Sequence, residues 1–240
     1  MRRLNKIMKN MNYKKTFILL ILTSFAFTNI HSQDKKFSFF GSYNYGFGNL
    51  IACESSDLYY PYKEEVNKLR TGTMKQFEAG VYYGSFGLGL IHNTYETSAS
   101  TAYENADINY DGRFGNGIIS DELDLRFTGL ELLYKTPSII KKMDVTWKVG
   151  LGIQSYSINK EFNLMEVHPS QYEYTLTGDK WTMMGGVEIN YQLWKFIGIG
   201  LETSILPGNY TNLKDPESSS SVYKDNVTRL NAGLKIRITI

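Results

Sequence analysis

The sequence lacks the features that would indicate a disulfide-stabilised fold or a helical membrane protein. It has one cysteine, Cys53, so an intrachain disulfide is excluded. Beyond residue 33 no stretch approaches 18 consecutive apolar residues, and the sequence therefore predicts no transmembrane helix.

Residues 1–33 have the pattern of a secretory signal peptide. Six basic residues and no acid precede the apolar run TFILLILTSFAF, which leads into the polar TNIHSQ. The run is shorter than the roughly 20 residues that a helix needs to cross a bilayer. We expect cleavage near Ser32 or Gln33 and a single domain over residues 34–240.

The exported part of the chain also lacks an excess of positive charge. The whole chain has 26 basic and 24 acidic residues. The six basic residues of the predicted signal leave 20 against 24, a net charge of −4. This balance gives no electrostatic reason to expect nucleic acid as a partner.

What the sequence does contain is alternation. Apolar and polar residues alternate over long stretches, which is typical of strands whose two faces meet different media. The chain ends on LNAGLKIRITI, in which the alternation is unbroken to Ile240. The alternating stretches are residues 37–47, 76–83, 86–92, 123–134, 143–154, 185–193, 196–205 and 230–240.

One of these stretches, residues 123–134, changes phase. Leu123, Leu125 and Phe127 alternate with polar residues, and the apolar positions then shift to even numbers from Leu130 onward. A one-residue slip of this kind predicts a β-bulge at Gly129.

The connections alternate between short and long. Residues 84–85, 135–142 and 193–195 form short connections, whereas the long polar ones are residues 48–73, 95–121, 157–180 and 206–226. We predict an all-β fold, an eight-stranded antiparallel up-and-down barrel whose first and last strands pair, because closure removes exposed strand edges.

Three observations favour a transmembrane barrel, with the apolar face outside, over a soluble lipocalin-like carrier. Glycines lie on the polar face, where a narrow eight-stranded interior needs small residues. The apolar face carries no charged residue, as lipid requires. Aromatic residues gather near the short connections, where an interfacial girdle is expected. These aromatic residues are Phe37, Phe39, Tyr83, Phe86, Tyr134, Tyr191, Trp194 and Phe196.

This pattern resembles the small eight-stranded outer-membrane barrels of Gram-negative bacteria, which include the OmpX-like and OmpW-like proteins and the OmpA barrel. The resemblance covers nearly all of residues 37–240. The segment SQDKK at the end of the predicted signal and the strands rich in tyrosine and glycine look like those of chains from the Bacteroidetes. It implies an outer-membrane address, short periplasmic turns, four long extracellular loops, outer-membrane lipid as surroundings and the outer-membrane assembly machinery as a partner. The chain departs from the family by ending on Ile240 instead of an aromatic residue.

The predicted interior is charged. In a narrow, dry interior such charges must be paired, so we expect a salt-bridged plug, with a narrow conduit as the alternative. The side chains predicted to face inward are Glu78, Asp124, Glu131, Glu188 and Glu202 with Arg126, Lys148, Lys235 and Arg237.

A second candidate site is the segment DINYDG. Asp107, Asn109 and Asp111, followed by a glycine, match the start of a calcium loop, in which alternate oxygen side chains converge. The closing position holds Ile118 instead of glutamate, so Asp121 or Glu122 would have to complete the site. The alternative is a solvated loop with Asx turns.

A third candidate rests on His92 and Thr94, which share a face of one predicted strand. The lipid A-modifying barrels use a histidine, a hydroxyl and a carboxylate, and here Glu96 or Glu104 would supply the carboxylate. The alternative is that His92 is an interfacial polar residue, and we expect no enzymatic activity because a triad is defined by geometry. The sequence thus favours a structural or surface-interaction role through the loops. The alternative is a narrow channel, and a lipid-modifying enzyme or a soluble carrier is less favoured. The sequence identifies no extracellular partner.

Overall fold

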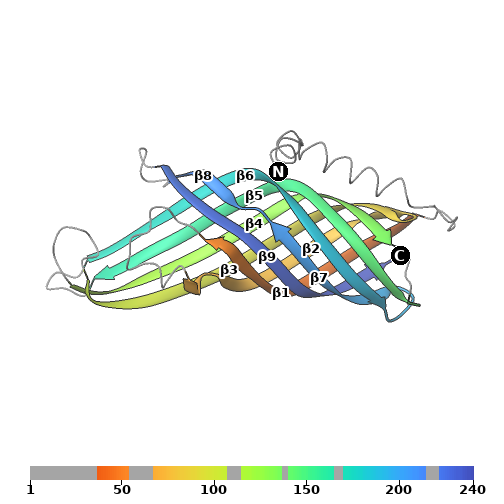
Figure 1. Cartoon of the computed structure of the whole chain (residues 1–240), viewed down its shortest axis with the longest axis horizontal. Helices are drawn as coiled ribbons and strands as arrows, with labels where there is room; N and C mark the ends of the chain where they lie inside the picture. The colour runs from red at the N-terminus through yellow and green to blue at the C-terminus, as the bar shows by residue number, and fades with distance from the viewer. Residues whose placement is uncertain (1–36, 54–66, 107–114, 137–139, 165–169, 215–221) are drawn as a thin grey trace, which may run out of the picture. The chain divides into compact units, whose positions relative to one another are not determined.

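The described residues of the computed structural model, 37–53, 67–106, 115–136, 140–164, 170–214 and 222–240, form one antiparallel sheet (Figure 1). The predicted signal peptide lies outside the described residues. The strands are β1 (Phe37–Cys53), β2 (Thr71–Tyr83), β3 (Phe86–Ala106), β4 (Gly115–Thr136), β5 (Met143–Leu164), β6 (Ser170–Gln192), β7 (Ile197–Leu206), β8 (Asn209–Lys214) and β9 (Val222–Thr239).

The sheet closes into a ring. β1 pairs with β9, placing Phe40 opposite Thr239, as predicted for the first and last strands. β7 and β8 both pair with β6 on one side and β9 on the other, so they are two parts of one strand of the wall. The interruption falls at Pro207 and Gly208, where proline offers no N–H to the ladder. The ring therefore has eight strands, and the predicted fold class is confirmed.

The short connections are confirmed as well. Gly84 and Ser85 form a two-residue turn between β2 and β3, and Gly84 has φ 62°. This left-handed conformation is one that glycine adopts without a steric penalty. Residues 193–196 connect β6 to β7.

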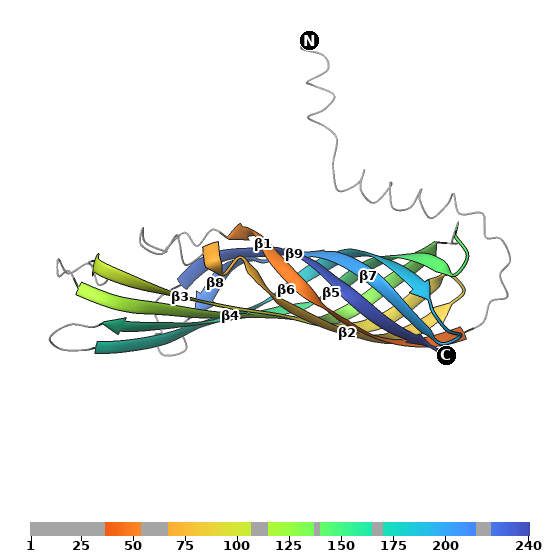
Figure 2. The same cartoon turned by 90° about the horizontal axis from the view of Figure 1, so that it is seen from below.

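The strands are longer than predicted. β3 to β6 contain 21, 22, 22 and 23 residues, so most of residues 95–121 and 157–180, predicted to be loop, is strand. Figures 1 and 2 show these four strands reaching past their neighbours. We call this part, residues 96–106, 115–126, 155–164 and 170–180, the projecting sheet.

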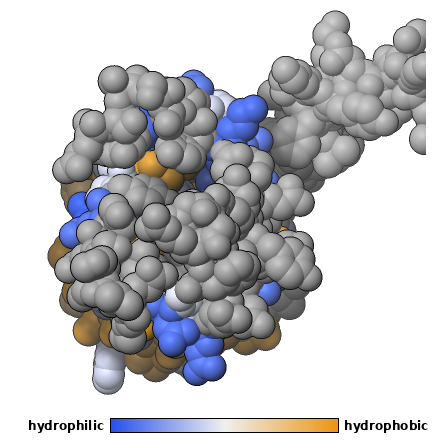
Figure 3. Space-filling model, turned by 90° about the vertical axis from the view of Figure 1, so that its left-hand side faces the viewer, coloured by the Kyte–Doolittle hydropathy of each residue, from blue (hydrophilic) through white to orange (hydrophobic). Residues whose placement is uncertain are grey.

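The lower part of the barrel, toward the short connections, is apolar outside and polar inside, as predicted. Large apolar side chains on the outer wall are exposed, and we call them the apolar belt. Among them are Leu88, Leu90, Leu130, Leu132, Val149, Leu151, Leu201, Leu234, Ile236 and Ile238. In Figure 3, viewed from the projecting end, hydrophilic side chains lie in front and hydrophobic ones lie behind them at the rim.

The predicted bulge at Gly129 is wrong. β4 keeps an uninterrupted register with both neighbours across this position. Leu125 is fully buried and Leu130 is 57% exposed, so both obey one alternation. The apparent change of phase in the sequence comes from a change of surroundings. Above the belt the interior is apolar and the outer wall is polar. Leu123 and Phe127 accordingly face inward with Leu125.

No helix in the described part of the chain is long and apolar enough to cross a membrane.

Candidate functional site

The lower interior contains a buried cluster of charges. Lys148 Nζ lies 2.6 Å from a carboxylate oxygen of Glu78, 2.7 Å from Glu202 and 3.0 Å from Glu188. All four side chains are almost completely shielded from solvent. One ammonium therefore bridges carboxylates from β2, β6 and β7, and it ties three separate parts of the wall together.

The terminal strand supplies the other two cations. Lys235 Nζ lies 2.9 Å from both Glu188 and Glu202 and also pairs with Glu78. Arg237 Nη2 lies 2.6 Å from Glu188. We call Glu78, Glu188, Glu202, Lys148, Lys235 and Arg237 the charge cluster. Its mutual pairing confirms the predicted charge-paired interior.

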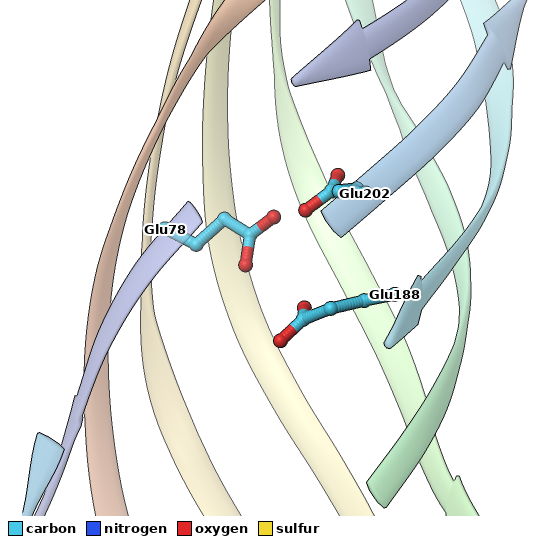
Figure 4. Close-up of side chains that lie close together, drawn as sticks. All are labelled: Glu78, Glu188 and Glu202. Atoms are coloured by element: carbon cyan, nitrogen blue, oxygen red, sulfur yellow. The ribbon is translucent and has the colours of Figure 1, made fainter. Parts of the chain in front are cut away.

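The three carboxylates converge, as Figure 4 shows. Glu78, Glu188 and Glu202 bring one oxygen each within 4.8 Å of one another, a spacing that could also hold a metal ion. Here Lys148 and Lys235 direct their ammonium groups at these oxygens and provide the compensating positive charge. The arrangement is therefore a structural salt-bridge network.

Apolar layers lie on both sides of the charge cluster. On the side of the short connections, Phe40, Tyr82 and Leu133 form a buried group in which the two rings are 5.0 Å apart. Arg237 lies over the Phe40 ring at 5.3 Å, which joins this layer to the charges. On the other side the buried layer consists of Ile91, Phe127, Met184 and Leu206.

Two of the predicted inward charges are wrong. Asp124 and Arg126 lie on the outer wall and pair with each other. Within the belt the inner face of β4 is polar, whereas above the belt its outer face is polar. The other predicted inward charges are confirmed as buried: Glu78, Glu131, Glu188, Glu202, Lys148, Lys235 and Arg237.

The sequence analysis missed a third buried cation on the terminal strand, Arg229. Its side chain is fully buried, donates from Nη2 to Asn93 Oδ1 at 2.7 Å and lies over the Tyr95 ring at 5.5 Å. Arg229 has the same phase as Lys235 and Arg237, so extending the alternation one residue toward the N-terminus would have found it.

Above the belt the interior is a second hydrophobic core. It contains Leu50, Leu69, Tyr95, Ala99, Leu123, Leu125, Tyr156, Ile158, Leu176, Tyr210, Leu213 and Val227.

One buried acid, Asp121, and one half-buried acid, Asp225, lie at the edge of this core. Asp121 pairs with Lys160 at 2.5 Å, and Asp225 accepts a hydrogen bond from the Tyr156 hydroxyl at 2.8 Å. Burial raises the pKa of Asp121 and also that of Asp225, and these polar partners only partly offset the effect. Neither residue was assigned to the interior by sequence reasoning.

The outer face of the projecting sheet is strongly acidic. Two cross-strand pairs place like charges directly opposite each other, Glu96 with Asp124 and Glu161 with Glu173. Such pairs destabilise a sheet unless something compensates them. The acids on this face are Glu96, Glu104, Glu122, Asp124, Glu161, Glu173 and Asp179.

Two shallow grooves run over this face. One, of about 430 Å³, is lined by residues that include Glu96, Glu122 and Asn159. The other, of about 380 Å³, includes Arg126 and Asp179. Both include Asp124 and Ser157, so they adjoin one another and form a continuous polar, acid-lined surface.

The remaining candidate residues are scattered. Asp107, Asn109 and Asp111 of the calcium hypothesis lie outside the described residues, and the possible completing ligand Asp121 faces inward. His92 is exposed in the belt, with Nδ1 2.8 Å from Thr128 Oγ1. Glu96, a proposed third group of the triad, pairs instead with Lys75 at 3.1 Å. The alternative carboxylate Glu104 is exposed on the projecting sheet.

No protein-family model and no curated protein matches the sequence. Among solved structures, a major outer membrane protein from Thermus thermophilus is similar at TM-score 0.52 and 10% identity, covering 85% of this chain and 100% of that one. At this identity the similarity supports the fold alone.

Other solved structures are similar at lower TM-scores. Neisserial surface protein A has TM-score 0.43 and 11% identity, covering 83% of this chain and 96% of its own. Ail, the attachment invasion locus protein of Yersinia pestis, has TM-score 0.37 and 8% identity, covering 83% and 97%. Both TM-scores are too low to carry an argument. The chain therefore has the fold of a small eight-stranded outer-membrane barrel with a buried, charge-paired interior.

Proposed function

We propose that this protein is an integral outer-membrane barrel that holds the projecting sheet outside the cell, where its acidic outer face binds positively charged macromolecules. The role is recognition and not catalysis. The predicted signal peptide and the apolar belt support the outer-membrane address.

The observation that carries this proposal is the distribution of charge on the projecting sheet. The outer face sets Glu96 opposite Asp124 and Glu161 opposite Glu173, and within the protein Glu96 pairs with Lys75 and Asp124 with Arg126. A cationic partner would add further compensation for these acids, and its approach would be accelerated by the field of the clustered acids.

The proposed address is tested first. The protein should fractionate with the outer membrane, and its unboiled form should migrate differently from its boiled form on a gel, because a closed barrel resists detergent. Recovery in a soluble fraction without a heat shift would contradict the proposal.

The binding role is tested with a lysine-rich peptide and the purified protein in detergent. Neutralising the opposed acids, as Glu96→Gln with Asp124→Asn and Glu161→Gln with Glu173→Gln, should weaken binding at least tenfold and reduce its salt dependence.

Asp144→Asn is the matched control, because it removes a carboxylate at the opposite end of the barrel, where Asp144 lies 3.9 Å from Lys135. Equal losses per neutralised carboxylate in the control and the four-residue variant would mean that net charge, and not this face, determines binding. Absence of binding by the wild-type protein would reject the recognition role.

A further inference from the structure

The charges around the charge cluster do not balance. Its three glutamates face three cations, and each glutamate lies in at least one ion pair with them. Glu131 is a fourth glutamate in the same part of the interior. It is fully buried, and both of its carboxyl oxygens lack a hydrogen-bond partner.

Glu131 occupies a niche built from glycine. Its directly opposite neighbours in the sheet are Gly89 on β3 and Gly150 on β5, so neither of these two positions offers a side-chain donor. A Cβ atom at Gly89 would lie 2.8 Å from Glu131 Oε1 and 3.1 Å from the Phe40 ring. The carboxyl therefore fills this space closely, and its oxygens have almost no surface accessible to water.

The charged groups that act on Glu131 come from four strands. Glu78 on β2 and Glu202 on β7 repel a negative charge there, whereas Lys148 on β5 and Lys235 on β9 attract it. Both ammonium groups already pair with the other glutamates. An ionised Glu131 would thus be a buried charge without a hydrogen-bond donor, which is far more costly than a buried neutral carboxyl.

We propose that Glu131 is a proton-binding site, so that at neutral pH its carboxyl is protonated and the surrounding interior carries no net charge. A proton is the ligand that fits, because both carboxyl oxygens have almost no surface accessible to water and no hydrogen-bond partner. The glycines at positions 89 and 150 keep the site free of donors that would favour the ionised form.

The test is infrared difference spectroscopy of the full-length mature protein in detergent near neutral pH. Subtracting the Glu131→Gln spectrum from that of the wild type should reveal a carboxylic acid C=O band, because the substitution removes a protonated group. The matched control is Glu188→Gln, whose difference spectrum should show loss of an ionised carboxylate. A carboxylate signal in the Glu131→Gln difference would overturn the proposal.

Stability gives an independent readout. Glu131→Gln and Glu131→Met both replace a neutral carboxyl with a neutral side chain of similar length, so at least one should keep the wild-type heat shift. Glu188→Gln, which leaves Arg237 and Lys235 with fewer partners, should unfold at a lower temperature. Failure of both Glu131 variants to form a barrel while Glu188→Gln folds would contradict the proposal.

Discussion

At the residue scale, buried and exposed ion pairs in this barrel differ in how much they contribute to the stability of the fold. Lys148 bridges three shielded carboxylates, whereas Lys75 pairs with Glu96 on the solvent side. A buried pair strongly destabilises the fold when one partner is removed, because the other charge is left without compensation. An exposed pair contributes little, because water and salt screen it.

We therefore expect Lys148→Met to lower the free energy of unfolding by about 3–5 kcal/mol, because it leaves the surrounding buried carboxylates without their compensating positive charge. Urea-induced unfolding in detergent or lipid measures the change. Lys75→Met is the control and should leave the unfolding midpoint almost unmoved. Similar effects of the two substitutions would refute the assigned interior pairing.

The half-buried acid Asp225 leads to a prediction about how stability depends on pH. Burial raises its pKa in the folded protein above the ordinary value of about 3.9. A group that binds its proton more tightly when folded stabilises the fold at low pH, and this stabilisation is lost as the pH rises through the raised pKa. The wild type should therefore lose stability from about pH 4 upward.

Asp225→Asn remains neutral at every pH and should show a smaller decline over the same range in thermal unfolding. The pKa of Asp121 is also raised, so this residue should account for part of the decline in stability with pH that remains in the variant. An unchanged slope in Asp225→Asn would show that this carboxyl does not contribute.

At the element scale, β4 crosses from one set of surroundings to another. Its outer face carries Asp124 and Arg126 in the projecting sheet, and then Leu130 and Leu132 in the belt. Its inner face reverses too, from Leu125 to Glu131. One uninterrupted strand therefore has a polar outer and apolar inner face in the projecting sheet, and an apolar outer and polar inner face in the belt. The boundary between these two parts lies between Arg126 and Leu130.

This boundary predicts how a charge on the outer wall will behave. Leu130→Arg should destabilise the barrel in lipid by about 2–4 kcal/mol if the belt lies at the membrane midplane. Ser157→Arg, on the outer face of β5 opposite Asp124, should be tolerated. Folding yield and urea midpoint in lipid vesicles measure both. Equal tolerance of the two substitutions would contradict the assignment of the belt to lipid.

At the scale of the whole molecule, the interior is filled in layers. Phe40, Tyr82 and Leu133 lie below the charge cluster, and two buried apolar groups lie above it. At the mouth near the short connections there is a recess of about 70 Å³. Eight-stranded barrels generally have interiors that side chains fill, and this layering fits that rule.

The layering predicts that the purified protein shows no sustained conductance in a planar bilayer. Phe40→Ala combined with Tyr82→Ala, which opens the lower apolar layer, should still not conduct, because the charge cluster and the upper core remain. Steady channel steps from the wild type would favour the alternative of a narrow conduit.

The sequence by itself determined the period of the strands, the ring of eight and the inward direction of Lys235 and Arg237, because strand geometry converts every second position into one face. Alternation reports that two faces differ, but not which medium each face meets. The passage of β4 from the belt to the projecting sheet therefore has the sequence pattern of a β-bulge at Gly129. The polar outer face of the projecting sheet, rich in serine and glutamate, has the sequence pattern of a loop. Only the tertiary structure decided these points. It also decided which charges pair, because Glu78 and Lys235 are 157 residues apart in the chain and meet only when β1 and β9 close the ring.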